Sequence, residues 1–162
     1  FDGPIAIRYP RGSAHQGLQE YQAPVEYGRS EIIRKGKKIA VLGVGSMIPS
    51  CMEICKGLKD DGYDPTFVNA RFVKPLDVDL LDELAKDHSL FVTVEENVKS
   101  GGYGEHVSAY MEACHPEIRV LSAAVWDRFV PQGNVESLRS RIGLGVEDIR
   151  QAIEDSEELR EQ

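Results

Sequence analysis

The chain has 162 residues and a formal net charge of −8 at pH 7, and 41% of its residues are hydrophobic. This length suffices for one domain, or for one domain and an arm, with a proper core. The acidic charge argues against nucleic acid as a partner, and no apolar run approaches the roughly 18 residues of a membrane span.

Residues 1–23 differ in character from the rest of the chain. Residues 4–9 alternate like a strand, Pro10 stops the pattern, and a polar, glutamine-rich connector follows. An isolated strand cannot pair its backbone groups. We therefore interpret residues 1–23 as the tail of a preceding domain plus its linker, disordered or paired with another molecule when that domain is absent. Residues 24–162 are then the compact domain.

Two arginines of this arm, Arg8 and Arg11, flank Tyr9 and Pro10. Because proline fixes its own backbone angle, a guanidinium beside it is held at a rigid strand end, which suits bidentate binding of a phosphate or a carboxylate. Composition favours the alternative, a solvent-exposed charge on a linker. The chain opens without methionine, as a fragment of a longer protein would, and shows no secretory signal pattern. Three cysteines in this length do not form a disulfide framework, so we expect a reducing, cytoplasmic setting.

The sharpest local pattern lies in residues 38–50, after an expected edge strand at residues 26–34. A short apolar strand leads into a Gly-Val-Gly-Ser turn at residues 43–46 and then into a helix. Such a turn aims backbone N–H groups at one point, as in a nucleotide cradle. The third glycine of the dinucleotide fingerprint is missing, however, and no acidic residue follows the next strand. The pattern therefore favours a packing turn.

Strands and helices then alternate to the end of the chain. We expect strands at residues 66–70, 89–95 and 118–121. Three helices are expected to begin after Met47, after an Asp77 cap and after Gly101, and two more are expected at residues 135–142 and 146–156. The tail from Glu154 is acidic and is expected to fray. The helix after Met47 places five apolar residues on one face: Met47, Cys51, Ile54, Cys55 and Leu58. The alternation predicts an α/β three-layer sandwich around a mostly parallel sheet.

Four charged residues follow strands at the carboxyl edge of this expected sheet, where α/β folds bind ligands. Arg71 and Lys74 could hold an anion or pair with Glu95 and Glu96, and the acidic composition favours ion pairs. Adjacent residues of a strand point to opposite faces. Glu95 and Glu96 are therefore poorly placed to act as one site, and structural capping is favoured for them.

Cysteines and histidines offer weaker candidates for a site. Cys51, Cys55 and the pair Cys114 and His115 could contribute to a metal site, but no CxxC pair is present, and buried packing on apolar helix faces is favoured. His88, between Asp87 and a strand, is interpreted as a turn residue. No Ser/His/Asp set and no P-loop can be identified.

Four co-linear motifs resemble the C-terminal part of the 1-deoxy-D-xylulose-5-phosphate synthase family. They are GPIAIRYPRG at residues 3–12, NARFVKPLD at residues 69–77, VTVEEN at residues 92–97 with two glycines after it, and DRFVPQG at residues 127–133. The family more often has Leu-Pro where this chain has Val125 and Trp126. The resemblance implies a transketolase-type C-terminal domain with a five-stranded mixed sheet, an antiparallel edge strand and flanking helices.

The resemblance also implies a function. Members of this family are thiamine-diphosphate enzymes that join pyruvate, after decarboxylation, to glyceraldehyde 3-phosphate, giving 1-deoxyxylulose 5-phosphate and CO₂ for isoprenoid, thiamine and pyridoxal synthesis. The cofactor and its Mg²⁺ belong to two upstream domains, so the fragment is expected to bind neither, to hold no catalytic residue and to be inactive by itself.

Its implied partners are those upstream domains and a second copy in a homodimer. One substrate contact carries over, Arg11, which matches the arginine that holds the phosphate of the aldehyde. The alternatives are the C-terminal domain of a transketolase or of a 2-oxoacid dehydrogenase β-subunit, and a stand-alone binding module.

Overall fold

The structure, a computed structural model, describes residues 2–9, 15–21 and 23–158. Five strands form one sheet: β1 (Glu31–Arg34), β2 (Lys38–Gly43), β3 (Thr66–Asn69), β4 (His88–Val98) and β5 (Arg119–Val125). Their order is β1-β3-β2-β4-β5. Only β1 runs antiparallel to its neighbour, and the other pairs are parallel. The expected five-stranded sheet with an antiparallel edge is therefore confirmed.

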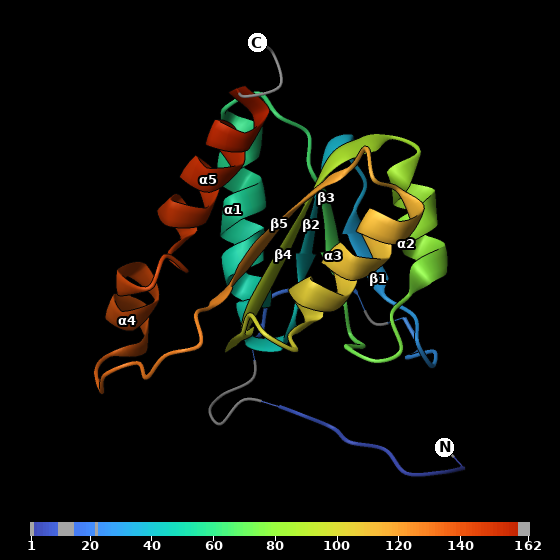
Figure 1. Cartoon of the computed structure of the whole chain (residues 1–162), viewed down its shortest axis with the longest axis horizontal. Coiled ribbons are helices and arrows are strands. Elements are labelled where there is room, and N and C mark those ends of the chain that lie inside the picture. Colours follow the sequence, from blue (N-terminus) through green and yellow to red (C-terminus); the bar gives the residue numbers. More distant parts are fainter. Residues whose placement is uncertain (1, 10–14, 22, 159–162) are drawn as a thin grey trace.

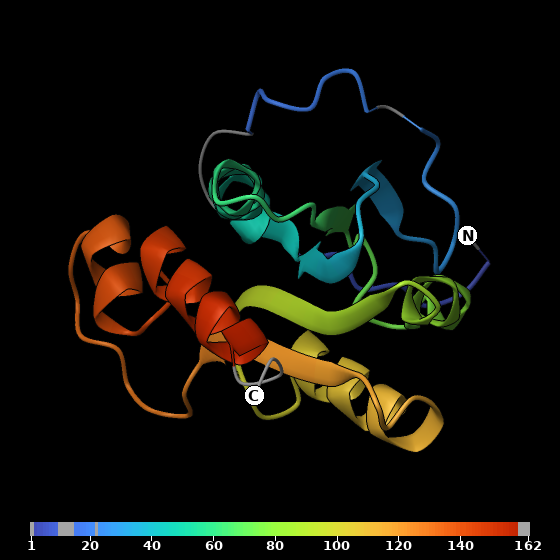
Figure 2. The same ribbon diagram turned by 90° about the horizontal axis from the view of Figure 1, so that it is seen from above.

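Helices cover both faces of this sheet. They are α1 (Ile48–Asp60), preceded by a 3₁₀ turn at Gly45–Met47, α2 (Val78–Ala85), α3 (Tyr103–Cys114), α4 (Val135–Arg141) and α5 (Val146–Glu158). Helices α1 and α5 contribute to the core on one face, and α2 and α3 to the core on the other, as Figure 1 shows. Helix α4 lies beside α5 in the views of Figures 1 and 2. The three-layer sandwich is confirmed, and no helix of the described residues is long and apolar enough to cross a membrane.

The core follows the sequence pattern closely in β2 and α1. Residues 39–42 of β2 are fully buried, as expected for an interior strand. All five residues of the predicted apolar face are buried as well: Met47, which ends the 3₁₀ turn, and Cys51, Ile54, Cys55 and Leu58 of α1. Strand β1 is shorter than expected, because the first part of residues 26–34 forms a turn. The backbone N–H of Arg29 closes this turn by donating to the carbonyl oxygen of Glu26.

Glycine at position 104 allows α3 to lie directly on the sheet. A Cβ atom there would come 2.3 Å from Oγ of Ser122 on β5 and 2.5 Å from Oγ1 of Thr93 on β4. Real Cβ atoms do not approach other atoms so closely, so a larger residue would push the helix away from both strands. This approach places the first turn of α3 within reach of the end of β4.

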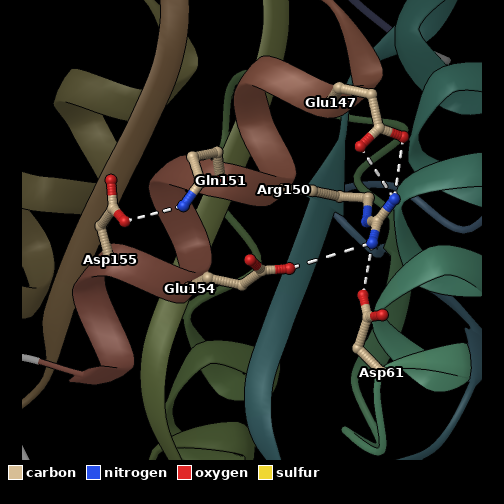
Figure 3. Close-up of polar contacts among 6 residues, drawn as sticks. All are labelled: Asp61, Glu147, Arg150, Gln151, Glu154 and Asp155. Atoms are coloured by element: carbon tan, nitrogen blue, oxygen red, sulfur yellow. Dashed lines mark hydrogen bonds and ion pairs between the residues drawn. The ribbon is translucent and has the colours of Figure 1, made fainter.

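Helix α5 is fastened to α1 by Arg150 (Figure 3). Its guanidinium donates to both carboxylate oxygens of Glu147, at 2.8 and 2.9 Å, pairs with Asp61 at the end of α1, and lies 3.9 Å from Glu154. A Cβ atom at Gly57 would meet this guanidinium at 2.6 Å, so glycine leaves room for it. The helix continues to Glu158, beyond the residue from which we expect fraying.

His88 is not the turn residue that the sequence suggested. It is the first residue of β4 and is buried. Its Nδ1 lies 2.8 Å from the carbonyl oxygen of Leu84, which can only accept, so Nδ1 carries the proton. Its Nε2 therefore accepts from Oγ1 of Thr66 at 2.7 Å, and that oxygen in turn accepts from the N–H of Gly36 at 2.9 Å. The neutral ring thus links α2, β3 and β4.

We expect the chain to lose stability as the pH falls below about 6.5, the ordinary pKa of histidine, because of His88. Burial lowers the pKa of His88 in the folded chain. The unfolded chain therefore binds the proton at a higher pH than the folded chain does, and stability falls as the pH decreases through that interval. Urea unfolding at pH 7.5 and pH 5.5 measures the effect, and His88→Gln should reduce the difference. The matched control is His106→Gln, an exposed position on α3; an equal change in both variants would contradict the assignment.

The arm and linker do not join the sheet in the described residues. Residues 2–9 form no strand, and the side chains of Ile5, Ile7 and Tyr9 are exposed. Leu18 of the linker packs against the core cluster on the α1 side. Part of the segment that we assigned to a preceding domain and its linker therefore contacts the compact domain.

Candidate functional site

The strand order identifies one place where this fold can bind a ligand. The chain leaves β2 through α1 on one face of the sheet and leaves β4 through α3 on the opposite face. The connections from these neighbouring strands diverge, and open α/β sheets bind ligands in the crevice beyond such a switch point. In this chain the crevice lies between the turn at residues 43–46 and the end of β4.

Three side chains meet at this switch point, and we refer to them as the Glu96 node: Ser46, Glu96 and Arg139. The hydroxyl of Ser46 donates to Oε2 of Glu96 at 2.8 Å. Arg139, on α4, donates to both carboxylate oxygens of Glu96, from Nε at 3.2 Å and from Nη2 at 3.1 Å. Such two-pronged pairs fix geometry as well as charge.

The arm reaches the same place. Nη2 of Arg8 donates to the backbone carbonyl oxygen of Glu96 at 3.4 Å. In Figure 1 the arm, in dark blue, runs past the ends of β2 and β4 at this edge of the sheet. Four segments that are far apart in the sequence therefore meet at Glu96.

The Glu96 carboxylate is ionised at neutral pH. Burial by itself raises the pKa of Glu96, but the hydrogen bonds from Arg139 and Ser46 and the charges of Arg139 and Arg8 outweigh it and hold the pKa below its ordinary value. A carboxylate in this state accepts hydrogen bonds and does not donate a proton. Its chemistry is therefore that of an anchor for cations.

Glu95 points to the opposite face and has a different role. Its side chain is buried, and it accepts from the backbone N–H of Tyr103 at 2.9 Å and of Gly104 at 2.8 Å, in the first turn of α3. Gly102, the N-cap residue of α3, has no side chain for this purpose. The predictions that the two glutamates point apart and that Glu95 is a structural cap are confirmed.

Arg71 forms an ion pair as the composition indicated, but the predicted partner is wrong. Its Nη2 lies 2.5 Å from Oε2 of Glu31 on β1, and its guanidinium also donates to the carbonyls of Ala23 and Pro24, where the linker meets the compact domain, each at 3.3 Å. The partner differs because β3 is paired with β1 on one side, whereas β4, which carries Glu95 and Glu96, is separated from β3 by β2. Lys74 is exposed.

The cysteines divide into two groups. Cys51 and Cys55 are buried, and burial raises the pKa of both thiols, that of Cys55 to about 12. They are therefore protonated at neutral pH and pack as small hydrophobic residues. Cys114 is exposed, contrary to expectation, since Met111 is the last residue of α3 that the sheet buries. Among the described residues no three metal-binding side chains gather in one place.

Sequence reasoning missed two members of the node. Ser46 is the last residue of the glycine turn at the carboxyl end of β2, so its position was a usable signal. Arg139 lies 43 residues after Glu96, on a helix outside the alternating pattern, and nothing local marked it. The predicted substrate residue, Arg11, lies outside the described residues.

Comparisons with known proteins identify the family that this chain resembles. Residues 28–149 match the family of the transketolase C-terminal domain. Relatives named 1-deoxy-D-xylulose-5-phosphate synthase include those of Lachnoclostridium phytofermentans, 42% identical over 150 residues, and Dictyoglomus thermophilum, 40% identical over 154 residues. These alignments cover 92% and 94% of this chain but 24% and 25% of the relatives, so the chain spans about a quarter of their length.

Solved structures support the same fold. A split-gene transketolase described as an inactive beta4 tetramer has a TM-score of 0.75 and 29% identity, covering 81% of this chain and 43% of that one. A transketolase of Campylobacter jejuni has a TM-score of 0.53 and 18% identity, covering 79% of this chain and 18% of that one. At that identity the second likeness concerns the fold only.

Proposed function

The chain belongs to the transketolase C-terminal domain family, and from this premise we propose that it is the C-terminal part of a 1-deoxy-D-xylulose-5-phosphate synthase. The observation that carries the proposal is 42% identity over 92% of the chain to a relative with that name. The solved transketolase with 29% identity is less similar in sequence. The synthase is therefore favoured over a transketolase or a 2-oxoacid dehydrogenase β-subunit.

In this proposal the whole enzyme condenses pyruvate with glyceraldehyde 3-phosphate and releases CO₂, with thiamine diphosphate and Mg²⁺ as cofactors. It acts in the cytoplasm as a homodimer. Residues 1–23 are the end of its preceding domain and the linker, residues 24–162 are the C-terminal domain, and Arg11 holds the phosphate of the aldehyde.

The described residues of this chain do not fit the cofactor. The acidic side chain at the switch point, Glu96, is committed to Arg139 and Ser46, and Glu95 is committed to the amides of α3. Neither is left to hold Mg²⁺, and the glycine turn lacks the third glycine of a dinucleotide cradle. We assign cofactor binding to the preceding domains. The role that we assign to this chain is to support their active site.

We expect the chain by itself to form no 1-deoxyxylulose 5-phosphate from pyruvate, glyceraldehyde 3-phosphate, thiamine diphosphate and Mg²⁺. The same protein extended by its preceding domains should form it, as detected by mass spectrometry and by release of CO₂. Omitting thiamine diphosphate from the extended protein is the control. Turnover by the chain in isolation, or none by the extended protein, would refute the proposal.

A further inference from the structure

We propose that one edge of the sheet, at the carboxyl ends of the parallel strands, is the face on which the preceding domain of the whole enzyme packs. We refer to this face as the carboxyl edge. The inference rests on the proposed function, in which residues 1–23 are the end of that domain and its linker. It goes beyond that function because it assigns to named turns of this chain a partner, an apolar surface of the preceding domain.

Exposed apolar side chains gather at the carboxyl edge. In residues 24–156 eight large hydrophobic side chains are exposed, and all of them lie at this edge. They belong to the end of a parallel strand, to the turn or helix start that follows one, or to the segment that leads into β1. Within the same residues, the turns of the opposite edge expose no large hydrophobic side chain. Such a one-sided distribution is typical of a face that contacts another protein surface.

One group of four surrounds the start of β1 and the turn after β3. Its members are 37% to 69% exposed: Val25, Tyr27, Val73 and Val78. The ring of Tyr27 packs edge-on against that of Phe72, with the ring centroids 5.7 Å apart. This contact joins the segment before β1 to the turn after β3. The apolar surface of the group is therefore preorganised for a partner.

The second group of four surrounds the ends of β4 and β5. Its members are Val98, Trp126, Phe129 and Val135. Nζ of Lys99 lies 5.0 Å from the centroid of the Trp126 ring, so the turn after β4 contacts the turn after β5. Phe129 is 104% exposed, and its ring is fully open to solvent. Exposed aromatic rings of this kind are the anchors that fill pockets of a partner protein.

Several charges at the carboxyl edge are already paired within the chain. Arg29 pairs with Asp77 and Asp79, Arg71 pairs with Glu31, and Arg139 pairs with Glu96. Covering a charge that keeps its partner costs less free energy than covering an unpaired charge. A second domain can therefore pack on this edge without leaving these three guanidinium groups unpaired.

The course of the chain favours the preceding domain as the partner. The matched family is a C-terminal domain, and the chain spans about a quarter of the length of its relatives. In the proposed enzyme, most of the protein therefore precedes this part. The described residues of the arm, 2–9, run past the carboxyl edge in Figure 1, with Ile5, Ile7 and Tyr9 exposed. A domain joined to the arm is held near this edge by the chain itself, at a high effective concentration.

Hydroxyl-radical footprinting, followed by mass spectrometry, measures the exposure of these side chains directly. In the extended protein, oxidation of Tyr27, Trp126 and Phe129 should be at least about fivefold lower than in the chain by itself, because the interior of an interface excludes water. Cys114, exposed at the end of α3 on the opposite edge, is the control and should react equally in both proteins. Equal oxidation of the three aromatic side chains in both proteins would overturn the interface.

A second copy of the chain is the alternative occupant of the carboxyl edge. Footprinting the chain by itself at a low concentration and at an about hundredfold higher one tests this alternative, because self-association depends on concentration. We expect the same oxidation of Trp126 and Phe129 at both concentrations. Protection that appears only at the higher concentration would assign the face to a second copy and would overturn its assignment to the preceding domain.

A charge at position 129 tests whether one domain covers both groups. Phe129→Asp should leave the urea midpoint of the chain by itself unchanged, because the ring is fully exposed there. In the extended protein it should raise the oxidation of Tyr27, in the other group, at least about twofold, since an unpaired charge cannot stay buried in an interface. Lys37→Asp, on the opposite edge, is the control and should leave Tyr27 protected. Protection of Tyr27 that survives Phe129→Asp would refute a single domain that covers both groups.

These outcomes are distinct from those that test the proposed function. An extended protein that does not turn over pyruvate and glyceraldehyde 3-phosphate would refute the function, and footprinting would still decide whether the carboxyl edge is covered. An exposed carboxyl edge in an active extended enzyme would refute the interface and leave the function standing.

Discussion

Replacing Glu95 with alanine is expected to lower the free energy of unfolding by about 3 kcal/mol. The carboxylate is 2% exposed and satisfies the backbone N–H groups of Tyr103 and Gly104 at the start of α3. Each buried donor that loses its partner costs about 1–3 kcal/mol, and the helix end also loses a favourable negative charge. Urea unfolding at pH 7 measures the change.

Two further variants make this test specific. Glu95→Gln keeps one oxygen acceptor but presents an amide donor to the second N–H, so its loss should be smaller than that of alanine. Glu112→Ala removes an exposed glutamate from α3 and should change stability by no more than about 0.5 kcal/mol. A loss below about 1 kcal/mol for Glu95→Ala would show that the two amides find other partners.

Replacing Arg11 with alanine in the extended enzyme is expected to have the largest effect on substrate binding. Loss of a charge-assisted contact to phosphate costs roughly 2–4 kcal/mol, which corresponds to a rise in KM of about 30-fold to 900-fold. The rise should concern glyceraldehyde 3-phosphate and leave pyruvate nearly unaffected. Steady-state kinetics with each substrate varied in turn measures it.

The matched variants are Arg11→Lys and Arg8→Ala. Lysine keeps the charge but cannot form the two-pronged contact, so Arg11→Lys should lie between the unmodified enzyme and alanine. Arg8→Ala should have a smaller effect than Arg11→Ala, because only Arg11 is assigned a contact to the phosphate. Unchanged kinetics for the aldehyde in Arg11→Ala would remove Arg11 from the site.

Asp77 shows which contacts a local sequence pattern can predict and which it cannot. Its predicted role as a helix cap is confirmed, since Oδ1 accepts from the N–H of Leu80 at 3.3 Å. The same carboxylate also accepts from the N–H of Ser30 at 2.7 Å and from Arg29 at 3.0 Å. Those partners precede Asp77 by nearly fifty residues and could not be predicted, because the chain brings them together only when β1 pairs with β3.

The errors have the same origin. His88 looked like a turn residue because Asp87 precedes it, yet it is buried by partners from α2 and β3. Arg71 was paired with the wrong glutamates because the position of β1 beside β3 cannot be deduced from the composition. In both cases the sequence position was identified, but the tertiary neighbours that decide its role were not.

By itself, therefore, the sequence determined the layers of the fold, the buried face of α1, the caps and the family, because periodicity, turn residues and motif order are local properties of the chain. Only the tertiary structure decided which side chains meet at the switch point. Glu96 joins Ser46, Arg139 and Arg8 there because strand order, a shifted register in β4 and the return of α4 combine contacts that are 43 to 88 residues apart.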